Sequence, residues 1–306
     1  MTEPPNAAAN HRALGEHFLA AQMPEKAVEQ LRAALSLEPD DAFTHALMAL
    51  ALVETNRLDA AAHEAQIALQ LEPDMAFYHF VRGVVFCAQH RWKEAQKALE
   101  TAIALDPDES DYHARLAGVW SALQKPRLAA QSAREALELD PDNPDAHLFL
   151  GQALLNLGEK DAARAHFERA VSLEPQSADA HNGMGACLLR LGDKQGALRS
   201  ISEALRLDPE NASARHNLVL AMGAKNPFYG LFWRWSLLLT RLPSWGQIAV
   251  ILGLWAAMRG LDALADANPA LRPYATDVLG FYLVFCVYTW VAPALFKAWL
   301  KRQNAI

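Results

Sequence analysis

The sequence contains little that would support catalysis, redox chemistry or a disulfide framework. Its 306 residues include three cysteines, Cys87, Cys187 and Cys286, which lie far apart without the CxxC or Cys/His spacing of a metal module. A GxSxG elbow, a phosphate-binding loop and an HExxH helix are all missing from it. Acidic pairs such as Glu135 and Glu138 have the i, i+3 spacing of exposed helix faces. We therefore expect no enzyme, no cofactor and no metal site.

Positive charge is scarce in the first part of the chain. Residues 223–306 hold eight Lys/Arg and three Asp/Glu, which leaves a net charge of −12 for residues 1–222. An acidic region has no electrostatic footprint for nucleic acid, so we expect no nucleic-acid partner. The start, MTEPPNAAANHRAL, also lacks the positive charge and apolar core of a secretion signal. We expect residues 1–7 to be disordered and any membrane attachment to come later.

What the sequence does contain is a repeat. Prolines recur every 34 residues, at Pro39, Pro73, Pro107, Pro141, Pro175 and Pro209. When the proline is counted as position 32 of each copy, positions 20 and 27 are alanine in all six copies. A constant period of this length indicates an array in which each repeat packs on its neighbours.

Within the repeat, the pattern predicts two packed helices. Position 8 is Gly or Ala in every copy, and such small residues let two helices approach closely. Leu157-Gly158 and Leu191-Gly192 are helix stops, which end the first helix of their repeats. The proline closes the second helix, and N-cap residues are expected soon after it, at Asp40, Asp74, Asp108, Asn143, Ser177 and Asn211.

These residues resemble the tetratricopeptide repeat. The resemblance rests on the small residue at position 8, Ala at 20 and 27, Pro at 32 and a large apolar residue at 24, namely Leu31, Leu99, Phe167 and Ile201. Position 24 departs from it at Ala65 and Ala133, and position 4, often Trp in the family, is His throughout. The resemblance implies an all-α, right-handed superhelix of six helix-pair repeats over residues 8–211, with a capping helix at 212–224.

Histidine recurs at position 4, at His11, His45, His79, His113, His147 and His181. Equivalent helices of neighbouring repeats lie about 8–10 Å apart, whereas two ligands of one zinc ion each lie about 2 Å from it. Residues of this ladder therefore cannot share one metal ion, and we expect packed imidazoles. A pH response of the ladder stays open.

The resemblance also implies that first-helix positions 2, 5, 9, 12 and 13 line a concave groove. The predicted partner-binding groove is apolar at Phe43, Leu50, Val53, Phe77, Phe80 and Val84 and acidic at Asp111, Asp145 and Asp179. Such a surface suits a peptide with a hydrophobic part and a basic part. The alternative is that Phe43 and Phe77 simply pack between repeats.

After the repeats the sequence becomes apolar and aromatic. Residues 225–245 combine Phe, Tyr and Trp with Lys and Arg, as segments at a lipid headgroup layer do. Residues 246–265 and 277–296 are long enough to cross a bilayer as two helices, joined by a turn at 266–276 and followed by a basic tail at 297–306. The alternative is a buried helical hairpin in a soluble domain.

Basic residues flank the two spans on the side of both termini, so the positive-inside rule places both termini and the repeats in the cytoplasm, at the inner membrane. The arrangement resembles bacterial membrane-anchored tetratricopeptide proteins. We expect a scaffold that captures a protein or peptide partner beside the lipid bilayer. The alternative is an assembly or quality-control factor whose hairpin contacts a membrane-protein client, with Arg259 and Asp262 as the recognition pair.

Overall fold

The computed structural model describes residues 7–223, together with residues 253, 256, 259–260 and 263–264. Between residues 7 and 223 the chain is helical, without strands, and its turns are short. The helices are α1 (Ala7–Ala20), α2 (Pro24–Leu37), α3 (Ala42–Glu54), α4 (Leu58–Leu71), α5 (Ala76–Ala88), α6 (Trp92–Leu105), α7 (Ser110–Ala122), α8 (Pro126–Leu139), α9 (Pro144–Leu157), α10 (Lys160–Leu173), α11 (Ala178–Leu191), α12 (Lys194–Leu207) and α13 (Ala212–Gly223).

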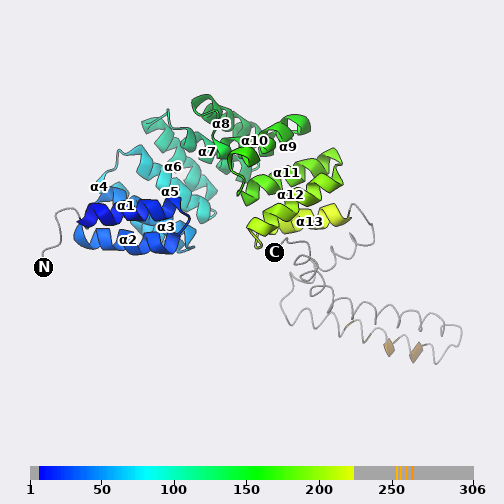
Figure 1. The fold of residues 1–306 in the computed structure, drawn as a ribbon, viewed down its shortest axis with the longest axis horizontal. Coiled ribbons are helices and arrows are strands. Elements are labelled where there is room, and N and C mark those ends of the chain that lie inside the picture. Colours follow the sequence, from blue (N-terminus) through cyan, green and yellow to red (C-terminus); the bar gives the residue numbers. More distant parts are fainter. Residues whose placement is uncertain (1–6, 224–252, 254–255, 257–258, 261–262, 265–306) are drawn as a thin grey trace. The chain divides into compact units, whose positions relative to one another are not determined.

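The helices form antiparallel pairs, as the repeat predicts. Figure 1 shows the two helices of a repeat side by side, for example α1 beside α2 and α11 beside α12. The helices α1–α10 belong to one compact unit that ends at Pro175, and α11–α13 belong to a second that begins at Gln176.

In the first unit, the odd-numbered helices form a continuous layer. Helix α1 contacts α3, α3 contacts α5, α5 contacts α7 and α7 contacts α9. Helices α2, α4, α6 and α8 each pack mainly on their own partner and on the first helix of the next repeat. Because successive first helices lie closer together than successive second helices, the stack bends with its first helices on the inner side.

The core of each repeat depends on a pair of residues at positions 8 and 24. A Cβ on Gly83 would lie 2.8 Å from Cγ of Leu99, and one on Gly185 would lie 2.4 Å from Cγ1 of Ile201. Gly15 with Leu31 and Gly151 with Phe167 show the same close approach. The two repeats with Ala at position 24 have Ala at position 8 as well, and all four of these alanines, Ala49, Ala65, Ala117 and Ala133, are buried. In these two repeats the carbon added at position 8 replaces only part of the side chain lost at position 24, and the contact between the two helices stays buried.

The turn inside each repeat contains one residue in the left-handed backbone region. Gly158 and Gly192, with φ of 90° and 86°, end α9 and α11, as their Leu-Gly pairs predicted. The earlier repeats have Gln22, Asn56, His90 and Gln124 at that place, with φ between 55° and 59°. This conformation costs a residue with a Cβ about 1–2 kcal/mol. The packing of the two helices must therefore offset this cost in the four earlier repeats.

The predicted N-caps are half correct. Asn143, Ser177 and Asn211 do accept bonds from the backbone N–H groups of Ala146, Ala180 and Ala214. In the earlier repeats the cap lies one residue later than predicted, at Asp41, Met75 and Glu109 rather than at Asp40, Asp74 and Asp108. The turn after the proline always has the same length, so the cap is the second residue after it. Of those three caps, only the carboxylate of Asp41 accepts backbone bonds, from Phe43 and Thr44.

Among the helices that the structure describes, none combines the length and the apolar character needed to cross a membrane. The predicted interfacial segment, both predicted spans, the turn and the tail lie outside the described residues, apart from six isolated positions between 253 and 264. The predicted disordered start lies outside them too, except for Ala7. The assignments for these segments stay predictions.

Candidate partner-binding surface

The six apolar residues of the predicted groove lie together on two neighbouring first helices. Phe43, Leu50 and Val53 are on α3, and Phe77, Phe80 and Val84 are on α5. Four of them, Leu50, Val53, Phe77 and Phe80, are partly buried against the hydrophobic core of the first three repeats. Phe43 is more open, with 37% of its surface exposed. Most of this surface therefore packs on the hydrophobic core, and Phe43 is accessible to solvent.

The aromatic rings form a continuous chain across three first helices. The ring centroids of Phe43 and Phe77 are 5.6 Å apart, those of Phe77 and Phe80 are 6.4 Å apart, and Phe80 stacks on Tyr112 of α7 at 4.9 Å. Aromatic pairs at these distances attract each other. Phe43 and Phe77 do pack between repeats, as the alternative proposed, and this packing leaves Phe43 exposed. Tyr112 was missed because its position 3 is an interface position in the repeat.

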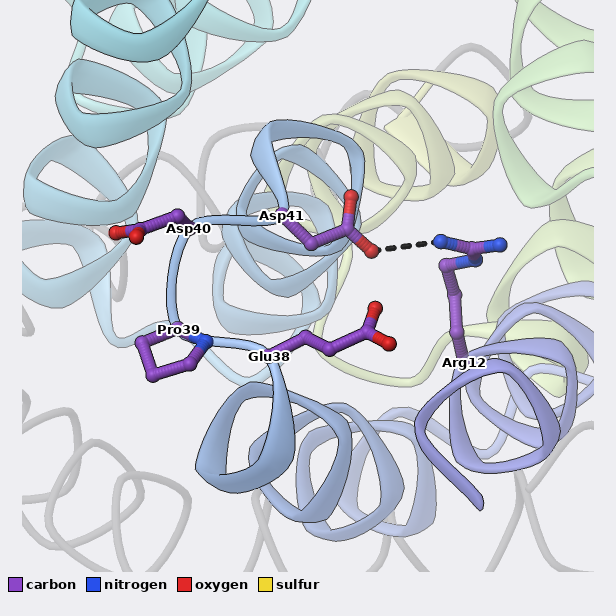
Figure 2. A pocket seen from close by; sticks show the side chains of 5 residues that line it. All are labelled: Arg12, Glu38, Pro39, Asp40 and Asp41. Carbon is purple, nitrogen blue, oxygen red and sulfur yellow. Dashed lines mark hydrogen bonds and ion pairs between the residues drawn. The ribbon is translucent and has the colours of Figure 1, made fainter. Parts of the chain in front are cut away.

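A cation lies at one end of this chain. The guanidinium of Arg12, on α1, is 6.0 Å from the ring centroid of Phe43, and its Nη1 donates to Oδ2 of Asp41 over 2.6 Å. Figure 2 shows Arg12 and Asp41 facing each other across an open depression, with the Glu38 carboxylate beside the pair and Asp40 turned away from it. The depression is thus lined by more acid than base.

The bonds to Asp41 decide its charge state. Burial raises the pKa of Asp41, but the hydrogen bonds from Thr44 and Arg12 outweigh burial and lower it below its ordinary value. Asp41 is therefore more readily deprotonated than an ordinary carboxyl group. Its carboxylate caps α3 and binds the guanidinium of Arg12. Arg12 is at position 5 of the first repeat, one of the positions expected to line the groove. The repeat pattern does not predict its pair with Asp41, because the two residues are 29 positions apart.

The acidic residues of the predicted groove are tied to neighbouring repeats. Oδ1 of Asp111 accepts a bond from Asn143 Nδ2 at 2.8 Å, and Oδ2 of Asp145 accepts one from Arg115 Nη2 at 3.2 Å. In the second unit, Oδ1 of Asp179 accepts a bond from Asn211 Nδ2 at 3.0 Å. A carboxylate has about four acceptor sites. These bonds orient the acids and leave acceptor capacity for a partner.

The histidine ladder has a structural role that the sequence spacing encodes. In four repeats the Nε2–H of the position-4 imidazole donates to the carbonyl of the proline six residues earlier, as His45 does to Pro39 and His113 to Pro107. The same bond joins His79 to Pro73 and His147 to Pro141, and all four distances lie between 2.8 and 3.0 Å. The histidine therefore fastens the turn between repeats to the helix that follows it.

The other ring nitrogen of the ladder differs from repeat to repeat. Nδ1 of His45 lies 2.6 Å from the Glu64 carboxylate, whereas Nδ1 of His147 lies 3.0 Å from Nδ1 of His166. Both partners of His45 are acceptors, so the pair with Glu64 needs a shared or additional proton. Among the described residues, no three His, Cys, Asp or Glu side chains gather to hold a metal ion.

Cys87 lies on α5, and burial raises the pKa of its thiol to about 11.

The described fold is an array of helix pairs, and in the first unit the first helices form one continuous layer. Arrays of this kind are the architecture of a class of scaffold proteins that bind other proteins along an extended surface. The tetratricopeptide repeat family model matches residues 46–95, 81–144, 121–173 and 150–212, which together span more than half of the chain. The chain belongs to the tetratricopeptide repeat family. Members of this family are in general non-enzymatic and bind protein or peptide partners.

Three solved structures share the fold. The type IV pilus biogenesis factor PilW has a TM-score of 0.56 and 19% identity over 70% of this chain and 100% of its own. Pseudomonas aeruginosa PilF has a TM-score of 0.54 and 23% identity over 69% and 96%. The APC/C hetero-tetramer Cut9-Hcn1 has a TM-score of 0.64 and 18% identity over 72% of this chain and 44% of that chain. At these identities the likeness shows the fold alone. Curated proteins give no match to the chain.

Proposed function

We propose that this protein is a membrane-anchored scaffold that captures a protein or peptide partner on the inner layer of its repeat array. The observation that carries the proposal is the aromatic chain that begins at Phe43, 37% exposed, continues through the partly buried Phe77 and Phe80 and ends on the buried Tyr112. A row of rings held by packing offers a preformed apolar surface, and preformed surfaces lose little conformational entropy on binding.

Charge supports a partner with a basic part next to its apolar part. The depression beside Phe43 has Glu38, Asp40 and Asp41 against Arg12, and Asp111 and Asp145 follow further along the same unit. Opposite charge speeds association and disfavours acidic competitors. We therefore expect binding to weaken as the salt concentration rises.

The membrane part of the proposal comes from the sequence. Residues 246–265 and 277–296 are the predicted spans, with Lys and Arg outside both of their outer ends, which favours a cytoplasmic location for the array. An anchor of this kind would raise the effective concentration of a captured partner beside the bilayer. Fractionation of cells followed by protease treatment of inner-membrane vesicles and spheroplasts tests both the attachment and the side on which the array lies.

The capture surface is tested by substituting its most exposed ring. Phe43→Ser should weaken capture of the co-purifying partner by about tenfold, because burial of an aromatic ring in an interface is worth about 1.5–3 kcal/mol. The matched control is Leu71→Ser, since Leu71 is equally exposed, at 39% against 37%, but ends a second helix. If both variants bind the partner as the unchanged protein does, the aromatic chain is not the capture surface. Phe77 and Phe80 are poorer test sites because both pack against the core.

The role of the predicted hairpin is separated from that of the array by an exchange. If residues 246–296 are replaced by an unrelated pair of membrane spans, a scaffold should still capture its partner. Loss of capture in the exchanged protein, with the Phe43→Ser variant unaffected, would instead favour the assembly or quality-control role with Arg259 and Asp262 in recognition.

A further inference from the structure

The fifth repeat differs from the others in the residue that its ladder histidine faces. His147, on α9, and His166, on α10, place their Nδ1 atoms 3.0 Å apart, with ring centroids separated by 5.2 Å and ring planes inclined by 33°. The residues at the place of His166 in the other repeats are Gln30, Glu64, Ala98, Ser132 and Ser200. Two imidazoles therefore converge here from the two helices of one repeat.

The backbone fixes the tautomer of His147. Its Nε2 lies 3.0 Å from the carbonyl oxygen of Pro141, which only accepts hydrogen bonds, so Nε2 carries the proton. In a neutral ring the lone pair then lies on Nδ1, the atom that faces His166. A hydrogen bond from the second ring nitrogen to a backbone carbonyl is also the usual support of a metal-bound histidine. His147 is thus oriented as a metal ligand is.

The separation of the two Nδ1 atoms fits one shared ion. Two nitrogen ligands at about 2.0–2.1 Å from a tetrahedral zinc ion lie about 3.3–3.4 Å apart. The observed 3.0 Å is within a few tenths of an ångström of that value. We propose that His147 and His166 bind one Zn²⁺ ion, or a borderline ion such as Ni²⁺ or Cu²⁺, through their Nδ1 atoms, with water completing the coordination.

This proposal departs from the expectation of no metal. The distance argument against a metal ion in the ladder concerned only the position-4 histidines, which lie in successive repeats. The second ligand comes from α10, at a position where no other repeat has histidine. A bound ion would join α9 to α10 and stiffen the fifth repeat.

Charges around the pair set the conditions for binding. Because Nδ1 of His147 accepts, the hydrogen bond between the two rings is donated by Nδ1–H of His166. Binding moves the Nδ1 proton of neutral His166 to its Nε2, and no net proton is released. Arg134, on α8, opposes a second positive charge here, whereas Arg169, on α10, is paired with Asp142. We expect Arg134→Gln to tighten metal binding.

The test measures Zn²⁺ binding to the full-length chain, purified in mild detergent without a polyhistidine tag. Competition with a chromophoric chelator at pH 7.5 should find one more bound ion per chain in the unchanged protein than in His166→Ser, which places in repeat five the serine found in repeat four. The extra site should weaken at least tenfold at pH 5.5, because protons compete for both imidazoles. Ni²⁺ titration should give the same stoichiometry.

The matched control is His79→Asn. His79 makes the same bond to its proline, but its Nδ1 faces the guanidinium of Arg82. This variant should keep the extra ion, and circular dichroism should show equal helix content in both variants. Equal stoichiometry in the unchanged protein and in His166→Ser would overturn the proposal and leave a hydrogen bond between two imidazoles. Loss of the ion in His79→Asn as well would overturn it too.

Discussion

Adding one methyl group at position 83 should have opposite effects in two backgrounds. In Gly83→Ala the new Cβ would lie 2.8 and 2.9 Å from two carbons of the fully buried Leu99, where carbon atoms prefer about 3.5–4.0 Å. Overpacking of this kind costs about 1–3 kcal/mol, and the change from glycine to alanine inside a helix returns about 1 kcal/mol. We expect a net loss of about 1 kcal/mol of unfolding free energy.

In the Leu99→Ala background the same methyl group should stabilise the protein. Leu99→Ala by itself removes a buried side chain and should cost about 2–5 kcal/mol. With Leu99 absent, alanine at position 83 meets no clash, fills part of the cavity and gains the helix propensity, so we expect a stabilisation of about 1 kcal/mol. The double variant reproduces in repeat three the Ala49 and Ala65 pair of repeat two.

The four proteins are compared by urea denaturation followed by far-UV circular dichroism, in the full-length chain. Because a repeat array need not unfold in one step, the transition of each variant is compared with that of the unchanged protein at several urea concentrations. A loss of stability from Gly83→Ala in both backgrounds, or a gain in both, would refute the steric account of the alternation between glycine and alanine.

Three further predictions concern a turn, a titration and a cap. His90→Gly should raise stability by about 1 kcal/mol because it relieves the left-handed conformation, and Gly158→Ala should lower it by a similar amount, both measured by thermal unfolding. The pKa of His166 is lowered in the folded protein, so below about pH 6.5 the unfolded chain binds a proton more readily than the folded chain does. The free energy of unfolding should therefore decrease as the pH drops below about 6.5. Denaturation at a series of pH values should show a smaller decrease in His166→Ser. Asn143→Ala should cost about 2–3 kcal/mol because this amide, which caps α9 and bonds to α7, is buried. Asn211→Ala should cost about 1 kcal/mol in the same assay, because Asn211 makes a similar cap and a bond to Asp179 at a more exposed place.

The period of 34 residues was sufficient to predict the helix pairs, because helix stops and small contact residues recur with it. The period did not predict which residue caps α3, α5 and α7. Asp40 and Asp41 are both good capping residues, and only the length of the turn after Pro39 selects Asp41. Local chemistry therefore predicted that a cap exists, and the geometry of the turn decided which residue forms it.

The candidate surface was predictable only where it depends on positions within one repeat. Family positions led to Phe43, Phe77 and Phe80, which do share one layer of helices. The continuation to Tyr112 and the ion pair between Arg12 and Asp41 join residues of different repeats, which a pattern within one repeat does not contain. Contacts between repeats depend on the angle at which the helices cross, and that angle follows from packing.

The sequence by itself determined the repeat, the helical class and the recurrence of histidine six residues after proline, because these follow from spacing along one chain. Only the tertiary structure decided what each histidine does. It set Nε2 of His147 on a carbonyl and Nδ1 opposite His166, 19 residues away on another helix. The physical reason is that backbone propensities act over one or two turns, whereas the partner of a side chain is chosen by the packing of whole helices.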